Sequence, residues 1–318
     1  MRHLMAFLRG REIPVPPKEA PMEDTPFLSV YPSFFPDFAC KADKCRHTCC
    51  QTWEIDIDPD TEALYRAEKG PLGEKLRNAM KTSPDGSTCF ALNEKGYCPL
   101  LTEKGLCSLV LEKGDDFLCQ ICRDHPRFYK YLGDFELCGT GLACERTVEQ
   151  LLEEKEPLRF RAGDIDFPLE SFLHSVLPGF PAEKLAFLPD FRTEPFLRTL
   201  ARLEQTAPID DRWTEDLTAL KKKAPFLSRR AKALFAARPE FWCNLFRYIL
   251  FRELDRLQDY AAETVLAFAA ENTVFILYLA ALSRELISSV CRWSEQIEYD
   301  TDNVDILLPL IEKEICHA

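Results

Sequence analysis

Apolar residues recur at steps of three and four along the second half of the chain, which is the pattern of amphipathic helices. A clear stripe runs from Pro239 to Asp259. The segment from Asn272 to Trp293 is apolar almost throughout and predicts a central helix, and a shorter helix is predicted from Asn303 to Ile315. We interpret the aromatic residues in these stripes as core packing, where most large apolar side chains lie.

The first half of the chain carries weaker helical patterns separated by turn signals. One helix is predicted from Asp58 to Met80, because a capping aspartate is followed at once by a proline. Leucines at helical spacing predict another from Ala143 to Glu154. Residues 155–168 predict a short strand or hairpin, and the proline-rich residues 1–37 predict an extended arm.

These patterns predict a mainly α fold with little β structure. After the arm at 1–37 we expect an irregular cysteine-rich cluster-binding domain at 38–155 and an all-helical domain at 156–318. We expect an active groove between these two domains. With 318 residues, 46% of them hydrophobic, the chain can bury a sizeable core without a metal to hold it together.

The chain is acidic, and this narrows the partners we expect. Its net charge of −12 argues against nucleic acid, because phosphate-backbone binding needs a basic surface. The apolar run at Leu4 to Leu8 is too short for an export signal, and Val274 to Leu282 falls short of the ~20 residues of a membrane span. We therefore expect a cytoplasmic protein with no membrane partner.

Cysteine is the anomalous residue in this composition. Disulfides are rare in a reducing cytosol, so clustered cysteines there indicate metal ligands or redox chemistry. Of the 14 cysteines, Cys243, Cys291 and Cys316 are scattered, and the rest share about a third of the chain. The clustered ones are Cys40, Cys45, Cys49, Cys50, Cys89, Cys98, Cys107, Cys119, Cys122, Cys138 and Cys144.

The spacing of these cysteines predicts a metal centre. The pair Cys49-Cys50 suggests a turn around a metal, and Cys119-x-x-Cys122 has the spacing of two ligands to zinc or iron. We favour an iron–sulfur cluster over structural zinc, because no tandem pair of the zinc-ribbon type is present, and over metal-free redox thiols. The preferred ligands are Cys40, Cys45, Cys49, Cys50, Cys98, Cys107 and Cys122.

Several blocks of residues together carry a family resemblance. They are Phe38-x-Cys40-x4-Cys45-x3-Cys49-Cys50-x2-Trp53, Tyr97-Cys98-Pro99-Leu100-Leu101, Gly105-Leu106-Cys107, Cys119-x2-Cys122-Arg123-x2-Pro126-Arg127, Leu142-Ala143-Cys144-Glu145 and Ser294-Glu295-x-Ile297-Glu298-x4-Asn303. This arrangement resembles the flagellin lysine-N-methylase family. A wider family of zinc- or iron-chelating proteins shares the first cysteine blocks in looser form.

The resemblance implies transfer of a methyl group from S-adenosylmethionine to lysines of flagellin or a similar protein, by an enzyme that carries a 4Fe–4S cluster. The residues alone do not indicate this activity. They include no glycine-rich turn of Rossmann type and no Cys-x3-Cys-x2-Cys loop. The alternative is a non-enzymatic iron–sulfur or zinc module that senses or carries metal and binds a protein partner.

If the chain transfers methyl groups, a few side chains are candidates for the work. Trp53 could stack on a cation or on adenine, and Asp58, with Asp56, could dock the lysine. Glu298 could accept a proton. Arg123, Arg127 and Asn303 could hold the cofactor. The competing interpretations are a core residue for Trp53, a helix cap for Asp58 and a solvent-facing position for Glu298.

Overall fold

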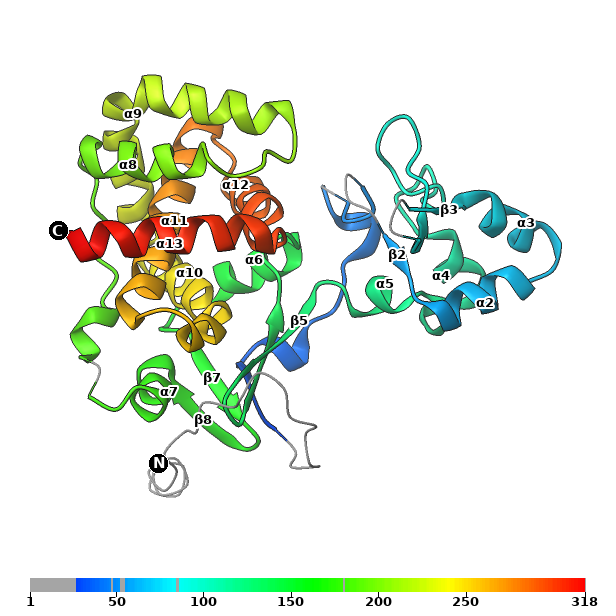
Figure 1. Cartoon of the computed structure of the whole chain (residues 1–318), viewed down its shortest axis with the longest axis horizontal. Coiled ribbons are helices and arrows are strands. Elements are labelled where there is room, and N and C mark those ends of the chain that lie inside the picture. The colour runs from blue at the N-terminus through cyan, green and yellow to red at the C-terminus, as the bar shows by residue number, and fades with distance from the viewer. Residues whose placement is uncertain (1–26, 47, 52–54, 84–85, 180, 318) are drawn as a thin grey trace. The chain divides into compact units, whose positions relative to one another are not determined.

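A computed structural model shows a mainly helical protein (Figure 1). Helices make up 59% and strands 13%, which confirms the predicted fold class. The chain divides into two compact units. Residues 39–127 form the smaller unit, and the chain up to 38 and from 128 onward forms the larger unit. The residues that the structure describes are 27–46, 48–51, 55–83, 86–179 and 181–317.

The smaller unit packs short helices around a three-stranded antiparallel sheet in which β4 lies between β2 and β3. The predicted helix from Asp58 to Met80 starts as expected, since the Asp58 Oδ1 accepts the Thr61 N–H at 3.0 Å. It is interrupted at Glu68 and Lys69, whose backbones are extended, and a second helix starts at Gly70 with a φ of +74°. The elements are β2 (Asp56–Ile57), α2 (Pro59–Ala67), α3 (Gly70–Ala79), β3 (Met80–Thr82), β4 (Thr88–Phe90), α4 (Ser108–Lys113) and α5 (Gln120–Asp124), with 3₁₀ turns at Ala42–Lys44 and Asp115–Phe117.

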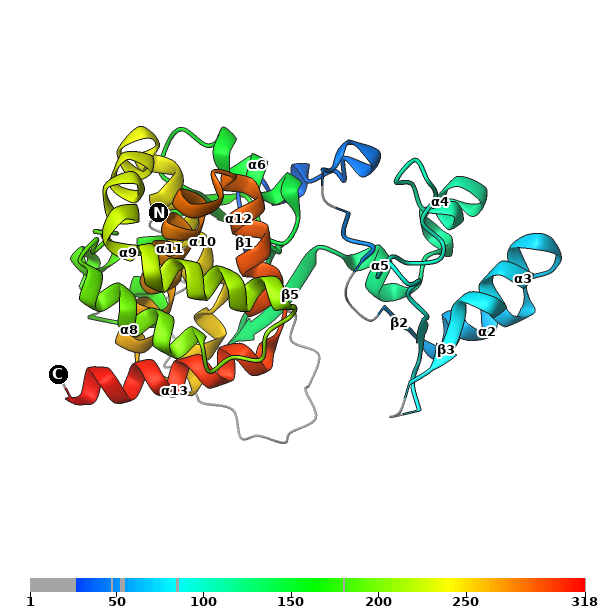
Figure 2. The same ribbon diagram turned by 90° about the horizontal axis from the view of Figure 1, so that it is seen from above.

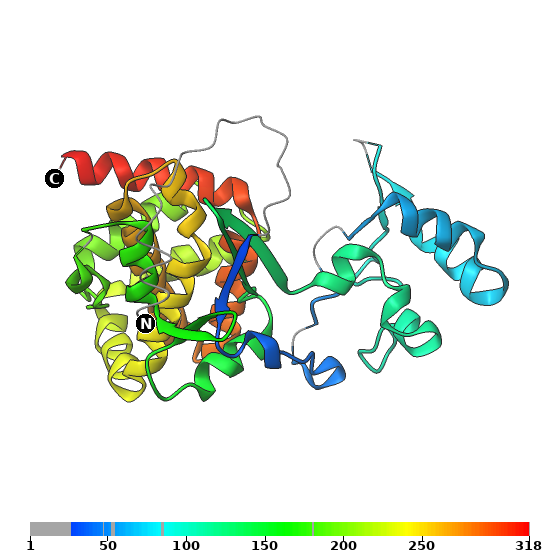
Figure 3. The same ribbon diagram turned by 90° about the horizontal axis from the view of Figure 1, so that it is seen from below.

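The larger unit contains a five-stranded sheet in the order β5-β6-β1-β7-β8. Its central strand, seen in blue in Figure 3, runs parallel to β6 and antiparallel to β7. This strand lies within the predicted arm, and the hairpin of β7 and β8 confirms the strands predicted at 155–168. The strands are β1 (Leu28–Pro32), β5 (Arg127–Leu132), β6 (Phe135–Thr140), β7 (Arg159–Ala162) and β8 (Ile165–Pro168).

Helices account for most of the larger unit, and α11 is its centre. It packs against α8, α9, α10, α12 and α13, several of which surround it in Figure 2. The helices are α6 (Glu145–Glu153), α7 (Leu169–Val176), α8 (Thr193–Leu203), α9 (Asp211–Ala237), α10 (Pro239–Arg252), α11 (Ala262–Ser283), α12 (Leu286–Trp293) and α13 (Thr301–His317), with 3₁₀ turns at Phe35–Asp37, Ala182–Leu185 and Leu254–Gln258 and a π-helix at Ser294–Glu298.

The predicted central helix is confirmed, with different ends. It starts at Ala262 rather than Asn272 and stops at Ser283, because Arg284 adopts a left-handed φ of +68° and a new helix follows. Among the described helices α11 alone is long and apolar enough to cross a membrane by length and composition. Of its most apolar stretch, 67% is buried inside the protein, as expected of a core helix.

A buried ion pair joins α10 to the π-helix after α12. The Arg252 Nε lies 3.0 Å from a carboxylate oxygen of Glu298, and both side chains are almost fully buried. The guanidinium lies between the rings of Phe128 and Tyr299, 4.5 and 5.3 Å from their centroids. The same carboxylate accepts the N–H of Leu142 at 3.0 Å. One pair of charges thereby links α10, the π-helix, β5 and the residues just before α6.

Gly141 packs so closely against Tyr299 that a methyl group cannot be added without displacing the ring. A Cβ built there would lie 2.6 and 2.8 Å from two ring carbons of Tyr299. Replacing Gly141→Ala should therefore lower the free energy of unfolding of the larger unit by about 1–3 kcal/mol, the usual cost of overpacking. Urea denaturation followed by circular dichroism measures the loss.

The matched control for this substitution is Gly163→Ala in the turn between β7 and β8. Nothing lies within 4 Å of a Cβ built there, so only its positive φ of +55° costs stability, about 1 kcal/mol. An equal loss in both variants would contradict the close packing at Tyr299.

Candidate metal centre

Five cysteines share the core of the smaller unit. Cys98 and Cys119 are buried within it, and Cys50, Cys107 and Cys122 pack against it half-buried. They come from separate stretches of chain that the fold gathers around Tyr65 and Phe90. None of the fourteen cysteines, all of which lie in the described part of the chain, is in a disulfide. The smaller unit therefore has a thiol-rich interior.

Two short helices carry three of these cysteines, and one of the three, Cys122, lies inside α5. Cys107 and Cys119 are the N-cap residues of α4 and α5, where backbone N–H groups lack partners within the helix. Burial raises the pKa of Cys107, and the nearby N–H groups of Leu109 and Val110 oppose this rise. The Cys122 side chain lowers the pKa of Cys119, and the Cys122 N–H adds to this effect. Such N–H donors stabilise thiolates and are a usual part of iron–sulfur sites.

Hydrogen bonds between segments hold the group together. The Cys98 N–H donates to the Cys50 carbonyl at 2.9 Å, and the Tyr65 hydroxyl donates to the Phe117 carbonyl at 2.9 Å. Asp58 caps α2 and also accepts the Gln120 N–H at the start of α5 at 2.9 Å. The helix-cap interpretation of Asp58 is thus confirmed, and this carboxylate ties two helix N-termini together.

The thiols also interact electrostatically. Burial, together with charge on Cys50, Cys107 and Cys119, raises the pKa of Cys98 to about 12. The hydrogen bond with Cys119, followed by burial, raises the pKa of Cys122 strongly. A hydrogen bond from Cys49 lowers the pKa of Cys50 to about 7. Without a cation among them these thiols cannot all ionise near neutral pH.

The donor chemistry fits a thiolate-ligated metal, but the side chains are not drawn together as ligands. Within the described ranges, no three His, Cys, Asp or Glu side chains are placed to hold a metal ion. The side chains of Cys119 and Cys122 lie close enough to shift each other's pKa, and Cys49 likewise lowers the pKa of Cys50. These are contacts that protonated thiols make, and binding a metal would replace them.

The predicted ligands are distributed unevenly around this group. Cys50, Cys98, Cys107 and Cys122 belong to it, whereas Cys40 and Cys49 are exposed and Cys45 is half-buried. The Cys40 sulfur accepts only a local N–H, from Ala42 at 3.4 Å.

Cys119 was missing from the predicted ligand set, although it is fully buried at the centre of the group. The signal was present in the sequence, because Cys119 is the first member of the Cys119-x-x-Cys122 pair. Cys138 and Cys144 lie outside this group, in the larger unit, on β6 and at the N-cap of α6.

Two of the other predicted site residues, Glu298 and Asn303, belong to the larger unit. Glu298 is buried against Arg252, so its interpretation as a solvent-facing residue was wrong. The Asn303 amide is also buried and bonds to backbone groups of Ala207 and Gln296. The roles of Glu298 and Asn303 in catalysis or cofactor binding remain predictions.

The remaining candidates are at the surface of the smaller unit or outside the described residues. Arg123 and Arg127 are exposed, and Asp56 is an exposed residue of β2. Trp53 lies outside the described residues, so its predicted stacking role stays a prediction.

Comparison of the chain with protein-family models, with curated proteins and with solved structures found no match. The fold and the thiol group are therefore the observations from which a function can be argued, together with the resemblance of the cysteine blocks.

His125 should make the metal-free smaller unit sensitive to acid. Burial lowers its pKa from 6.5 to about 4, so the folded chain keeps the imidazole neutral while the unfolded chain protonates it. Stability should therefore fall as the pH drops from about 6.5 towards 4. Thermal unfolding of the metal-free protein across this range measures the slope.

The variant His125→Gln isolates this contribution, because Asp58 also loses its hydrogen-bonded charge in acid. The variant should show a shallower decline between pH 6.5 and 4. Identical slopes for both proteins would show that the imidazole titrates normally.

Proposed function

We propose that the smaller unit binds a cysteine-ligated metal centre, with a 4Fe–4S cluster as the preferred form and zinc as the alternative. The observation that carries the proposal is the gathering of five thiols from separate stretches of chain into one core. Thiolates held together repel one another unless a cation lies among them, and binding a metal deprotonates them. The reduced state of all the cysteines suits a cytoplasmic location.

Four thiolates would satisfy either a cubane cluster or a tetrahedral zinc ion. We propose that they come from Cys50, Cys98, Cys107, Cys119 and Cys122. The backbone N–H groups near the sulfurs of Cys107 and Cys119 favour the thiolate form and would stabilise the ligands in the loaded state. Because five thiols are available for four positions, the ligand from the first cysteine block need not be Cys50. Cys45 or Cys49 of the same block could take its place.

Metal analysis tests this proposal. The full chain purified without oxygen should contain about four iron and four sulfide per molecule and absorb near roughly 400 nm. The variants Cys98→Ser and Cys122→Ser should lose most of the iron, because serine is a poor ligand for it. The matched control Cys316→Ser changes an exposed thiol of α13 and should keep full iron content.

Iron with sulfide would support the cluster, zinc without sulfide would support the alternative, and the absence of both metals would reject the centre. Stoichiometric zinc without sulfide would establish the structural zinc alternative. Metal-free protein after anaerobic purification and reconstitution, with a folded circular dichroism spectrum, would overturn the proposed centre.

We further propose, on the resemblance of the cysteine blocks, that the loaded protein is an S-adenosylmethionine-dependent protein-lysine N-methyltransferase. The cysteine blocks from Phe38 to Arg127 in that resemblance supply the five gathered thiols, which supports treating them as one functional unit. The target lysine amine, with an ordinary pKa of about 10.4, must first lose its proton. Its nitrogen then forms a bond to the methyl carbon as the carbon–sulfur bond breaks, and S-adenosylhomocysteine leaves.

A non-enzymatic metal module remains the second candidate, and one observation favours it. The two residues of the C-terminal block nominated for catalysis and cofactor binding, Glu298 and Asn303, already bond to groups of the protein. A module that senses or carries iron and binds a protein partner needs neither side chain at an active site.

Binding and transfer assays separate the two candidates. Under the methyltransferase proposal, the iron-loaded chain binds S-adenosylmethionine in anaerobic calorimetry and adds mass increments of about 14 Da to lysines of purified flagellin. The variant Cys98→Ser, which lacks the cluster, serves as the matched control. Iron-loaded protein that neither binds S-adenosylmethionine nor modifies flagellin would leave the metal module.

A further inference from the structure

One long face of α9 is exposed along the whole helix. Trp213, Leu217, Leu220 and Ala224 point into the core of the larger unit. The opposite face carries residues spaced by three and four positions, so they lie in one stripe. We call this the α9 stripe, and its members are Asp211, Thr214, Glu215, Thr218, Ala219, Lys222, Lys223, Phe226, Arg229 and Arg230.

Charge on the α9 stripe is separated by sign. Asp211 and Glu215 lie in its first half, and four cations lie in its second half. None of these six groups is in an ion pair with another residue of the described chain, whereas the neighbouring Lys221 pairs with Glu204. The unpaired cations are Lys222, Lys223, Arg229 and Arg230. On a protein of net charge −12, such a basic half-helix needs an explanation.

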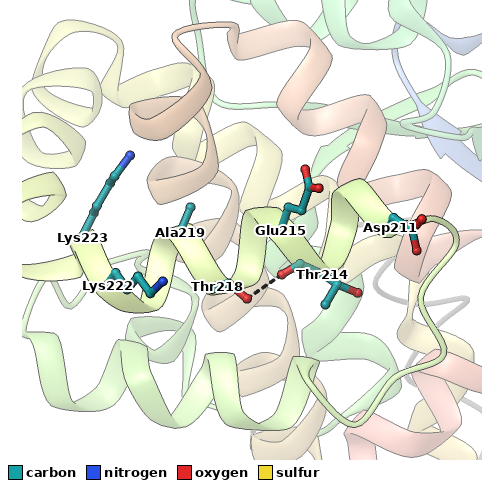
Figure 4. Close-up of a pocket in the computed structure, with 7 residues that line it drawn as sticks. All are labelled: Asp211, Thr214, Glu215, Thr218, Ala219, Lys222 and Lys223. Atoms are coloured by element: carbon teal, nitrogen blue, oxygen red, sulfur yellow. Dashed lines mark hydrogen bonds between the residues drawn. The ribbon is translucent and has the colours of Figure 1, made fainter.

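The stripe also carries a protruding side chain and a shallow hollow. Phe226 is 83% exposed and lies between the two pairs of cations, three and four positions from each. The hollow lies over the small residues Thr214, Thr218 and Ala219 (Figure 4). Asp211 and Glu215 line its first half and Lys222 and Lys223 its second, all from α9 itself. An apolar side chain would find little steric hindrance there.

We propose that the α9 stripe is a self-association surface, on which a second copy of this chain docks its own α9 in antiparallel orientation. In a two-fold pairing, residue i of one copy faces residue j of the other, and j faces i. The hollow runs along the helix from Asp211 to Lys223, so its midpoint in the sequence is near residue 217. If Phe226 of one copy lies at that midpoint on the other copy, the symmetry axis passes halfway between the two positions, near residue 222. Arg229 and Arg230 then face residues 213–215 of the other copy, next to Asp211 and Glu215.

Charge complementarity favours a second copy over other occupants. A nucleic acid or an anionic membrane would match the four cations, but Asp211 and Glu215 on the same stripe would face its phosphates. A second antiparallel copy places these carboxylates beside arginines at both ends of the contact. Two like-charged contacts remain, because Lys222 lies near the axis and meets its own counterpart, and the exposed Arg212 faces Lys232 of the other copy.

Sedimentation equilibrium of the full chain tests the proposal. A single helix pair buries a modest area, so we expect a weak dimer that forms below about 200 µM. The variants Phe226→Ser and Arg229→Glu/Arg230→Glu should each weaken dimerisation by about tenfold or more. Adding Asp211→Lys/Glu215→Lys to the arginine reversal should restore it, and Lys222→Gln should strengthen it.

Leu188→Ser is the matched control, because Leu188 is 86% exposed but lies outside α9. It should leave dimerisation unchanged. A monomer at every concentration, or a dimer indifferent to the stripe variants, overturns the proposal. So does binding of the monomer to vesicles of phosphatidylserine and phosphatidylcholine that the same variants abolish. None of these readings depends on metal content, so they are independent of the function proposed for the smaller unit.

Discussion

Thiol groups gathered in an apolar core can all ionise only if a cation lies among them. This constraint bears directly on the smaller unit, in which five cysteines share one core. Its interior holds Tyr65, Phe90 and five cysteines in place of a fully aliphatic core. The raised pKa values of Cys98 and Cys122 express the same constraint, because burial and neighbouring thiols oppose ionisation. A bound metal would turn that opposition into attraction.

The larger unit is stabilised in a different way. Its centre is an apolar helix bundle around α11, and the buried charges of Arg252 and Glu298 are paired with each other. The Arg252–Glu298 pair also receives the N–H of Leu142 and contacts two aromatic rings. Breaking one partner of such a pair leaves a buried charge, which costs far more than the pair contributes. The C-terminal block that resembles a methylase motif therefore has a clear structural role.

The sequence predicted helices well where the periodic pattern was long. The helix starting at Asp58 and the central helix were expected, since capping and periodicity are local signals. The breaks at Glu68–Lys69 and at Arg284 depend on the backbone conformation of one or two residues, which periodicity does not register. The strand at Leu28–Pro32 was hidden because its partners lie more than a hundred residues away along the chain.

The candidate site was predictable in kind and less so in detail. Cysteine density alone indicated a thiol centre in the first half, and four of the seven preferred cysteines lie in the gathered group. The number of cysteines in a segment could not show that Cys119 is buried and Cys40 exposed. Burial depends on how the helices α4 and α5 place their N-cap residues toward the core. Nor could that number show that Glu298 is buried, since its partner Arg252 lies on another helix.

The smaller unit interrupts the larger one, and this sets an order on biosynthesis. The central strand β1 is synthesised before the smaller unit, but both of its neighbours, β6 and β7, come after residues 39–127 in the chain. At translation rates of about 5–20 residues per second, β1 waits roughly 5–20 s for them. The smaller unit, residues 39–127, is therefore complete before the sheet of the larger unit can close.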